Sequence, residues 1–160
     1  MIPVFSFTAW SNTGKTTYIE KLIAELTKRG VRVAAVKHDG HKLALDKPGK
    51  DSWRFAQAGA ETVAVSSSEV CAVMYYRPMG LDEILSHIDG VDLILVEGWH
   101  GEGRNLIAIH REGTGQELKV PPENCIAVVS DVALDTGATP LFPLDDVCPM
   151  ADFLMERIKV

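Results

Sequence analysis

The sequence predicts an α/β domain with a mostly parallel sheet, and two observations predict it. Short apolar runs of strand length alternate with segments that carry apolar residues at helical spacing, which is typical of parallel sheets with helices packed on them. Residues 91–96 are almost continuously apolar, as in a strand that is buried on both faces of a parallel sheet. With 160 residues, of which 46% are apolar, the chain can fill one hydrophobic core. We therefore expect a single domain that spans residues 1–160.

The first 36 residues predict a β-α-β unit. Residues 2–7 form a short apolar run, and residues 16–29 carry a helical apolar stripe. Basic residues followed by Gly30 are typical of a helix end, and residues 31–36 then predict a second strand. Because such a crossover is almost always right-handed, the two strands are expected to be parallel members of one sheet.

The rest of the chain continues this alternation. Glycine, proline and charged residues without a period predict a long surface loop at residues 39–50, and we expect a mobile excursion at residues 111–124. The predicted helices span residues 51–58, 81–88 and 145–158. The further predicted strands span residues 62–65, 70–76, 91–96, 106–109 and 126–129. We also expect an antiparallel β extension to the parallel sheet.

Charge and composition argue against several classes of partner. A formal net charge of −6 argues against a general affinity for nucleic acid, which needs clustered Lys and Arg. The longest uncharged apolar runs are far shorter than the roughly 20 residues that a membrane-spanning helix needs. The N-terminus lacks the basic region of a signal peptide, and three widely spaced cysteines suit buried, free thiols. We therefore expect a cytoplasmic protein without nucleic-acid or membrane partners.

A phosphate-binding motif lies between the first predicted strand and the first predicted helix. Backbone N–H groups around Gly14 can hold a phosphate, Lys15 can reach the outer phosphates, and the Thr16 hydroxyl can bind Mg²⁺. This context predicts a P-loop NTPase-like fold; the alternative is a solvated helix cap. The other loop residues in the predicted nucleotide-binding set are Asn12, Thr13 and Thr17.

Ala9 departs from the usual P-loop pattern, which has glycine five residues before Gly14. A Cβ atom at this position restricts the backbone of the loop. Two interpretations remain open from the sequence. Either the loop holds phosphate less tightly, or the backbone at Ala9 has a negative φ that needs no glycine.

Glu97 ends the most apolar predicted strand. A carboxylate in such a place is costly unless it is paired or bound to a metal ion. Together with Thr16 it predicts a magnesium site at the carboxyl edge of the sheet. The alternative is a capping or salt-bridging glutamate.

Several further motifs accompany the P-loop: Gly14-Lys15-Thr16-Thr17 is followed by Val36-Lys37-His38 with His41, Asp46, residues 48–52, Arg54, residues 58–60 and residues 93–98. Together these motifs resemble those of the MobB family, which serves molybdopterin-guanine dinucleotide synthesis. The resemblance implies a GTP-binding P-loop protein, a weak GTPase that is usually a homodimer and uses Mg²⁺. It also implies a role in assisting the guanylyltransferase partner, of the MobA type, that attaches GMP to molybdenum-bound molybdopterin.

The resemblance adds candidates from the loop after the second strand. Asp46 and Asp51 become candidates near the metal, where carboxylates can position Mg²⁺ or an attacking water, and with Lys15 they form the predicted catalytic set. Exposed loop carboxylates are the alternative. Lys50 is a candidate for neutralising phosphate charge.

Asp131 is the candidate for recognising the base. It follows the last predicted strand, where many GTP-binding P-loop proteins place an aspartate that accepts hydrogen bonds from guanine N1 and N2. The longer sequence pattern of the better-known GTPases is lacking, so a helix or turn cap at Asp131 is the alternative.

Two other functions stay open at this point. A P-loop small-molecule kinase would need a lid of clustered arginines, and the chain offers only the scattered Arg54, Arg77 and Arg104. A nucleotide-binding module without turnover would bind nucleotide and use it only to order the loop at residues 37–52.

Overall fold

The computed structural model describes residues 1–39, 45–99, 101 and 103–158. His41 of the MobB-like motifs and most of the first half of the predicted 39–50 loop lie outside the described residues. The contacts gather in two compact units, Met1–His38 with Ile88–Val160, and Asp39–His87. The assignment of residues 1–160 to a single domain stays a prediction.

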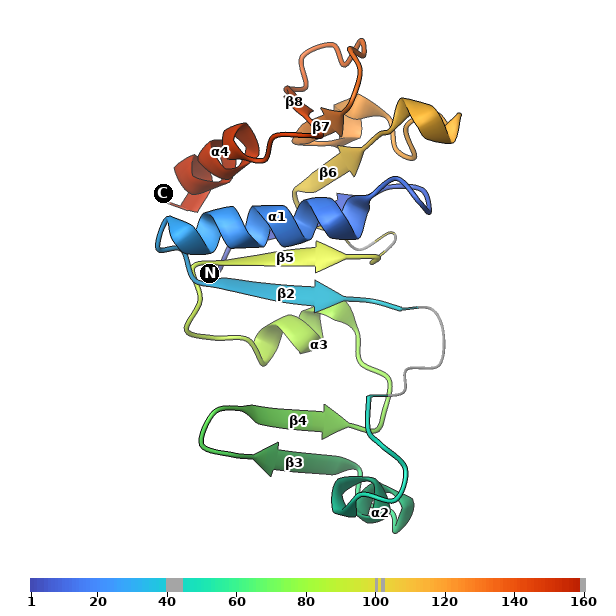
Figure 1. Ribbon diagram of the computed structural model, residues 1–160, viewed down its shortest axis with the longest axis vertical. Helices are drawn as coiled ribbons and strands as arrows, with labels where there is room; N and C mark the ends of the chain where they lie inside the picture. Colours follow the sequence, from blue (N-terminus) through green and yellow to red (C-terminus); the bar gives the residue numbers. More distant parts are fainter. Residues whose placement is uncertain (40–44, 100, 102, 159–160) are drawn as a thin grey trace. The chain divides into compact units, whose positions relative to one another are not determined.

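The larger unit is built on a parallel sheet (Figure 1). Its strands are β1 (Val4–Thr8), β2 (Val33–Lys37), β5 (Leu93–Glu97), β6 (Leu106–Ile109), β7 (Ala127–Ser130) and β8 (Leu141–Pro143). They lie in the order β2-β5-β1-β6-β7-β8, and every described pairing between them is parallel. The carboxyl ends of all these strands therefore share one edge of the sheet, and the predicted fold class is confirmed.

Alternate residues of the central strands face one core. Phe5 and Phe7 of β1 are almost fully buried there, and they share an apolar cluster with Leu154. Helices α1 (Lys15–Lys28) and α4 (Cys148–Ile158) supply the other side of this cluster. The period of two in the strands and the helical period in α1 thus bring their apolar residues to the same interface.

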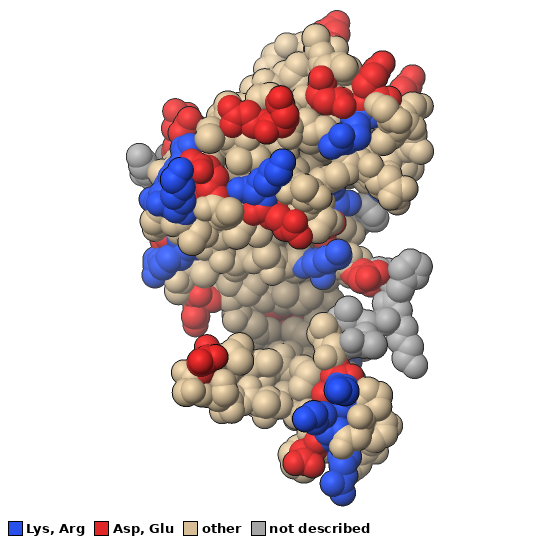
Figure 2. All heavy atoms as spheres, viewed as in Figure 1, with Lys and Arg blue, Asp and Glu red and all other residues tan. Residues whose placement is uncertain are grey.

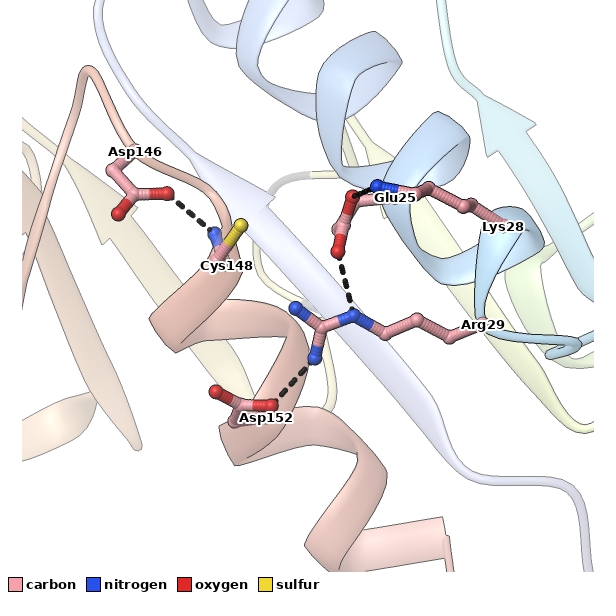
Figure 3. A network of polar contacts seen from close by, with 6 residues as sticks. All are labelled: Glu25, Lys28, Arg29, Asp146, Cys148 and Asp152. Carbon is pink, nitrogen blue, oxygen red and sulfur yellow. Dashed lines mark hydrogen bonds and ion pairs between the residues drawn. The ribbon is translucent and has the colours of Figure 1, made fainter.

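A polar network joins α1 to α4 beside this core (Figure 3). Arg29 follows α1; its Nε donates to Glu25 Oε1 at 2.7 Å, and its Nη1 donates to Asp152 of α4. The hydrogen bond from Arg29 lowers the pKa of the Glu25 carboxyl. Because ion pairs at a protein surface contribute little to stability, the apolar cluster must supply most of the attraction between the two helices.

A second ion pair lies at the amino ends of β2 and β5. The Arg32 guanidinium donates to both carboxylate oxygens of Asp92, at 2.6 Å and 3.1 Å, and the Arg32 backbone N–H donates to Oδ2 at 2.8 Å. These hydrogen bonds lower the pKa of Asp92 from its ordinary value of 3.8 to about 2. The pair therefore joins the beginnings of two neighbouring strands at the edge opposite the P-loop.

We predict that the contribution of Asp92 to stability is lost in acid. Its folded-state pKa lies below its unfolded-state value, so the contribution is complete above pH 3.8 and disappears as the pH falls through about 2. Urea unfolding of the wild type and Asp92→Asn at several pH values measures this. The wild type should be the more stable at pH 6, and the difference should shrink below pH 4; a difference that stays constant down to pH 2.5 contradicts the prediction.

The smaller unit contains the antiparallel extension that the sequence predicts. Strands β3 (Thr62–Ser66) and β4 (Cys71–Tyr75) form a two-stranded antiparallel sheet. Helices α2 (Asp51–Gln57) and α3 (Leu81–Ser86) belong to the same unit, and α2 packs against β3. The extension is thus a small sheet of its own, separate from the parallel one.

One expectation for the C-terminal half was wrong. The strand β7 is not the last one, because β8 follows it and pairs with it in parallel. A three-residue strand that ends in Pro143 gives no alternating pattern, and proline is tolerated because β8 lies at the edge of the sheet. The segment 111–124, predicted as a mobile excursion, contains two short 3₁₀ helices, η1 (Glu112–Thr114) and η2 (Pro122–Asn124).

The cysteines are free, but only Cys125 is buried; Cys71 and Cys148 are exposed, against the expectation of buried thiols. Acidic and basic side chains are interspersed over the larger unit on the face drawn in Figure 2. None of the helices in the described part of the chain is long and apolar enough to cross a membrane.

Candidate functional site

Three neighbouring strands bring polar residues to one edge of the parallel sheet. Strand β1 lies between β5 and β6, and its register places Phe7 opposite Glu97 and Thr8 opposite Ala108. The loop after β1, the end of β5 and the segment after β6 are therefore neighbours. A pocket of about 360 Å³ lies at this edge, lined by residues 10–17 and by Glu97.

The loop between β1 and α1 turns through two left-handed residues. Asn12 has a φ of 65° and Gly14 a φ of 86°. The Thr13 hydroxyl donates to the Trp10 carbonyl at 3.0 Å, and the Tyr18 N–H donates to the Gly14 carbonyl at 2.9 Å, which starts α1. The first N–H groups of a helix have no acceptor within it, so the start of α1 favours an anion in the pocket.

The structure supports the second interpretation of Ala9, a backbone that needs no glycine. Among the described residues other than glycine, only Asn12 and Asn105 have a positive φ. Ala9 is buried and adopts an ordinary backbone conformation, so it needs no glycine. The departure from the usual pattern does not strain the loop.

Lys15, Thr16 and Glu97 form one contact group in this pocket. The Thr16 hydroxyl donates to Glu97 Oε1 at 2.8 Å, and Lys15 Nζ lies 3.9 Å from the same oxygen. The side chains of Lys15 and Glu97 are 16% and 14% exposed. The two predicted magnesium ligands, Thr16 and Glu97, therefore lie in contact, with Lys15 beside them. Their binding of magnesium stays a prediction.

The same group fits a magnesium ion bound together with phosphates. Mg²⁺ is usually held by one or two carboxylates together with substrate phosphates and several waters. The carboxylate of Glu97 at the end of β5 and the Thr16 hydroxyl at the start of α1 could supply oxygen ligands of this kind. Within the described residues no three His, Cys, Asp or Glu side chains gather into a metal-binding group, so a cage made of protein ligands alone is not formed there.

Arg111 is a residue of this site that the sequence interpretation missed. Its Nε donates to the Thr13 carbonyl at 2.9 Å. Its Nη2 lies 2.9 Å from the place that a Cβ atom would occupy at Gly14, so a larger residue there would displace the guanidinium. The positive φ of Gly14 is what favours glycine at this position. Its position just after β6, the neighbour of β1, was the one signal in the sequence that could have indicated a place near the P-loop.

Trp10 is held by the same segment of the chain. Its indole N–H donates to the Glu117 carbonyl at 3.0 Å, and Lys119 Nζ lies 5.2 Å from the ring centroid. Burial lowers the pKa of Lys119, and the positive charge of Lys15 lowers it further. Lys15 lines the pocket, and Lys119 lies over the ring of Trp10, which also lines it, so both positive charges favour the entry of an anion.

Asp131 caps a short helix, which was the alternative to base recognition. Its Oδ1 accepts a hydrogen bond from the N–H of Glu112, the first residue of η1, at 2.9 Å. A carboxylate has further acceptor positions, so this contact leaves room for another donor. Recognition of the base by Asp131 stays a prediction.

The remaining candidates, Asp46, Lys50 and Asp51, lie in the smaller unit. Asp46 Oδ1 accepts a hydrogen bond from the Ser52 hydroxyl at 3.0 Å. Asp51 begins α2 and Lys50 precedes it, and both side chains are exposed. The roles of these residues near phosphate or metal stay predictions.

The fold and the site together define the class of protein. A six-stranded parallel sheet carries Gly14-Lys15-Thr16 where the loop after β1 leads into α1, and a carboxylate at the end of the adjacent strand. This is a P-loop NTPase-like protein.

The comparisons with known proteins identify the family. The MobB family, described as molybdopterin guanine dinucleotide synthesis protein B, matches residues 4–131, and the chain belongs to this family. The molybdopterin-guanine dinucleotide biosynthesis adapter protein of Escherichia coli is 42% identical over 99% of this chain and 95% of its own. The protein of the same description from Haemophilus influenzae is 37% identical over 96% of this chain and 88% of its own.

Solved structures agree with this assignment. A crystal structure of molybdopterin-guanine biosynthesis protein B has a TM-score of 0.74 at 27% identity and covers 98% of this chain and 99% of its own. A MobB homologue from Bacillus stearothermophilus has a TM-score of 0.68, also at 27% identity, over 98% of this chain and 97% of its own. The predicted family and fold class are therefore confirmed.

Proposed function

We propose that this protein is a GTP-binding adapter of molybdopterin-guanine dinucleotide synthesis. In this role it is a weak GTPase and a homodimer, and it assists the guanylyltransferase that joins GMP to molybdopterin. The contact group of Lys15, Thr16 and Glu97 in a P-loop pocket carries the proposal. Relatives from two bacteria that match over most of their length are described as adapter proteins of this synthesis.

Different side chains of the pocket would bind different parts of a triphosphate and its metal ion. Lys15 is a compact cation that can turn from Glu97 toward the outer phosphates, where the amide groups at the start of α1 also donate. Thr16 and Glu97 would hold Mg²⁺, which neutralises phosphate charge when bound. Because Glu97 would then serve the metal, it is not a free base for water, which favours slow hydrolysis.

Asp131 supports the choice of guanine in this proposal. It directly follows β7, at the same edge of the parallel sheet as the P-loop. A carboxylate there can accept hydrogen bonds from the N1–H and the 2-amino group of guanine. Adenine has neither donor at these positions, so it would leave the carboxylate without a partner.

Calorimetric titration with GTP and with ATP, each with and without Mg²⁺, tests the proposal. Magnesium-dependent binding of GTP that ATP does not match is the expected result. A preference for ATP would favour the kinase instead, although Arg77 is paired with Glu83 and does not offer an open arginine lid. Binding of GTP without any release of phosphate would favour the module without turnover.

The adapter role has a separate test. Adding this protein with GTP to the guanylyltransferase and molybdopterin should raise the yield of the dinucleotide above that of the partner alone. An unchanged yield over a range of protein concentrations would contradict the assisting role while leaving nucleotide binding intact.

We predict that Glu97→Gln mainly removes the effect of magnesium. The substitution keeps the shape of the side chain and removes the charge that would face the cation, so the gain in GTP affinity on adding Mg²⁺ should fall about tenfold. GTP binding without Mg²⁺ should change little. The exposed Glu20→Gln on α1 is the matched control, and an equal magnesium effect in both variants would show that Glu97 does not serve the metal.

A further inference from the structure

We propose that Arg111 is a positioning residue of the P-loop, which holds the peptide between Thr13 and Gly14 so that the Gly14 N–H donates to a bound phosphate. The proposal rests on the nucleotide-binding function proposed above. Arg111 lies 98 positions along the chain from Thr13, the loop residue that it contacts.

The contact determines the direction of one N–H group. Arg111 Nε donates to the carbonyl oxygen of Thr13 at 2.9 Å. That carbonyl and the N–H of Gly14 belong to one peptide group, and no described peptide bond is cis. In a trans peptide the C=O and N–H bonds point in opposite directions, so the Gly14 N–H points away from the guanidinium. Thr13 and Gly14 both line the pocket.

Without such a contact this peptide would be free to rotate. Gly14 has a φ of 86°, and glycine populates both signs of φ with little steric cost. Rotation of the peptide between Thr13 and Gly14 would exchange the N–H for a carbonyl oxygen, which repels phosphate. The guanidinium removes this freedom, and its charge makes the bonded amide a better donor.

Arg111 is itself held in place from the neighbouring strand. The N–H of His110, the residue before it, donates to the Val129 carbonyl of β7 at 2.8 Å. The N–H of Glu112, the residue after it, donates to Asp131 at 2.9 Å. The Thr114 hydroxyl donates to the carbonyl of Arg111 at 2.8 Å. The backbone around Arg111 is therefore anchored to the sheet on both sides, as a positioning residue requires.

The experiment compares Arg111→Ala and Arg111→Lys with the wild type. Titration with GTP and Mg²⁺ should show about tenfold weaker binding by Arg111→Ala. Arg111→Lys keeps the charge but loses the planar donor, so it should recover only part of the affinity. Arg32→Ala removes the same charge at the opposite edge of the sheet and should bind like the wild type.

The Gly14 amide supplies a readout that a general loss of stability would not move. In nitrogen–proton correlation spectra of folded protein saturated with GTP and Mg²⁺, the Gly14 amide proton should shift downfield in the wild type. The shift should be clearly smaller in Arg111→Ala at equal saturation. Circular dichroism and thermal unfolding establish that both Arg111 variants are folded before they are compared.

The outcomes separate this proposal from the proposed function. A wild-type protein that binds no GTP overturns the proposed function and the role of Arg111 with it. Normal binding by the wild type, with equal affinity and an equal Gly14 shift in Arg111→Ala, overturns only the role of Arg111. Full recovery of both affinity and shift by Arg111→Lys also overturns it, because charge alone would then be sufficient.

Discussion

Lys15→Ala is expected to weaken the binding of GTP with Mg²⁺ about a hundredfold. The Lys15 ammonium is the cation of the pocket that can reach the outer phosphates, and it lies 3.9 Å from the Glu97 carboxylate. A hydrogen bond to a charged group contributes about 1.5–3 kcal/mol, and 1.4 kcal/mol corresponds to a tenfold change in affinity.

Calorimetry on the folded variant measures this effect. Lys21→Ala, an exposed lysine of the same helix, is the control for the change in net charge and should bind GTP like the wild type. If Lys15→Ala retained the affinity of the wild type, the pocket at the start of α1 would not be the phosphate site. The assignment of Thr16 and Glu97 to magnesium would then fail as well.

Among the substitutions predicted here, Leu154→Ala is expected to lower the free energy of unfolding most. Leu154 is fully buried in α4, within the cluster that joins α1, α4 and the parallel sheet. Removal of a buried leucine side chain costs about 2–5 kcal/mol, through lost burial and the cavity that remains. For a chain of this size the melting temperature should fall by about 10 °C.

Urea and thermal unfolding measure this loss, with Glu156→Ala as the control. Glu156 is exposed on the same helix, and surface substitutions of this kind usually change stability by no more than about 0.5 kcal/mol. Equal stability of Leu154→Ala and the wild type would mean that α4 does not depend on this cluster. The ion pair between Arg29 and Asp152 would then have to hold the helix instead.

The elements of the parallel sheet were predictable because their patterns are local. The apolar runs at 91–96 and at 106–109 predicted β5 and β6 within two residues of their bounds. The helical stripe and Gly30 predicted α1 in the same way. Strand β8 was not predictable, because three residues that end in proline become a strand only through pairing with β7.

The candidate site was predictable where residue type and position along a strand were sufficient. Glu97 ends β5 and Lys15 opens α1, and two adjacent parallel strands necessarily bring such positions together. Asp131 was found by the same argument from topology. The hydrogen bond that it accepts from the Glu112 N–H could not be predicted, because that contact depends on the path of the chain after β6.

The P-loop NTPase-like fold, the MobB family and the placing of Thr16 and Glu97 at one edge of the sheet could be predicted from the sequence alone, because short patterns and strand ends encode them. The backbone conformation of Ala9 and the contact of Arg111 with the Thr13 carbonyl became visible only in the folded chain. The contact of Arg111 joins residues 98 positions apart through the neighbouring strands β1 and β6. No local pattern specifies such a contact, since it depends on strand order and on the conformation of the segment that follows β6.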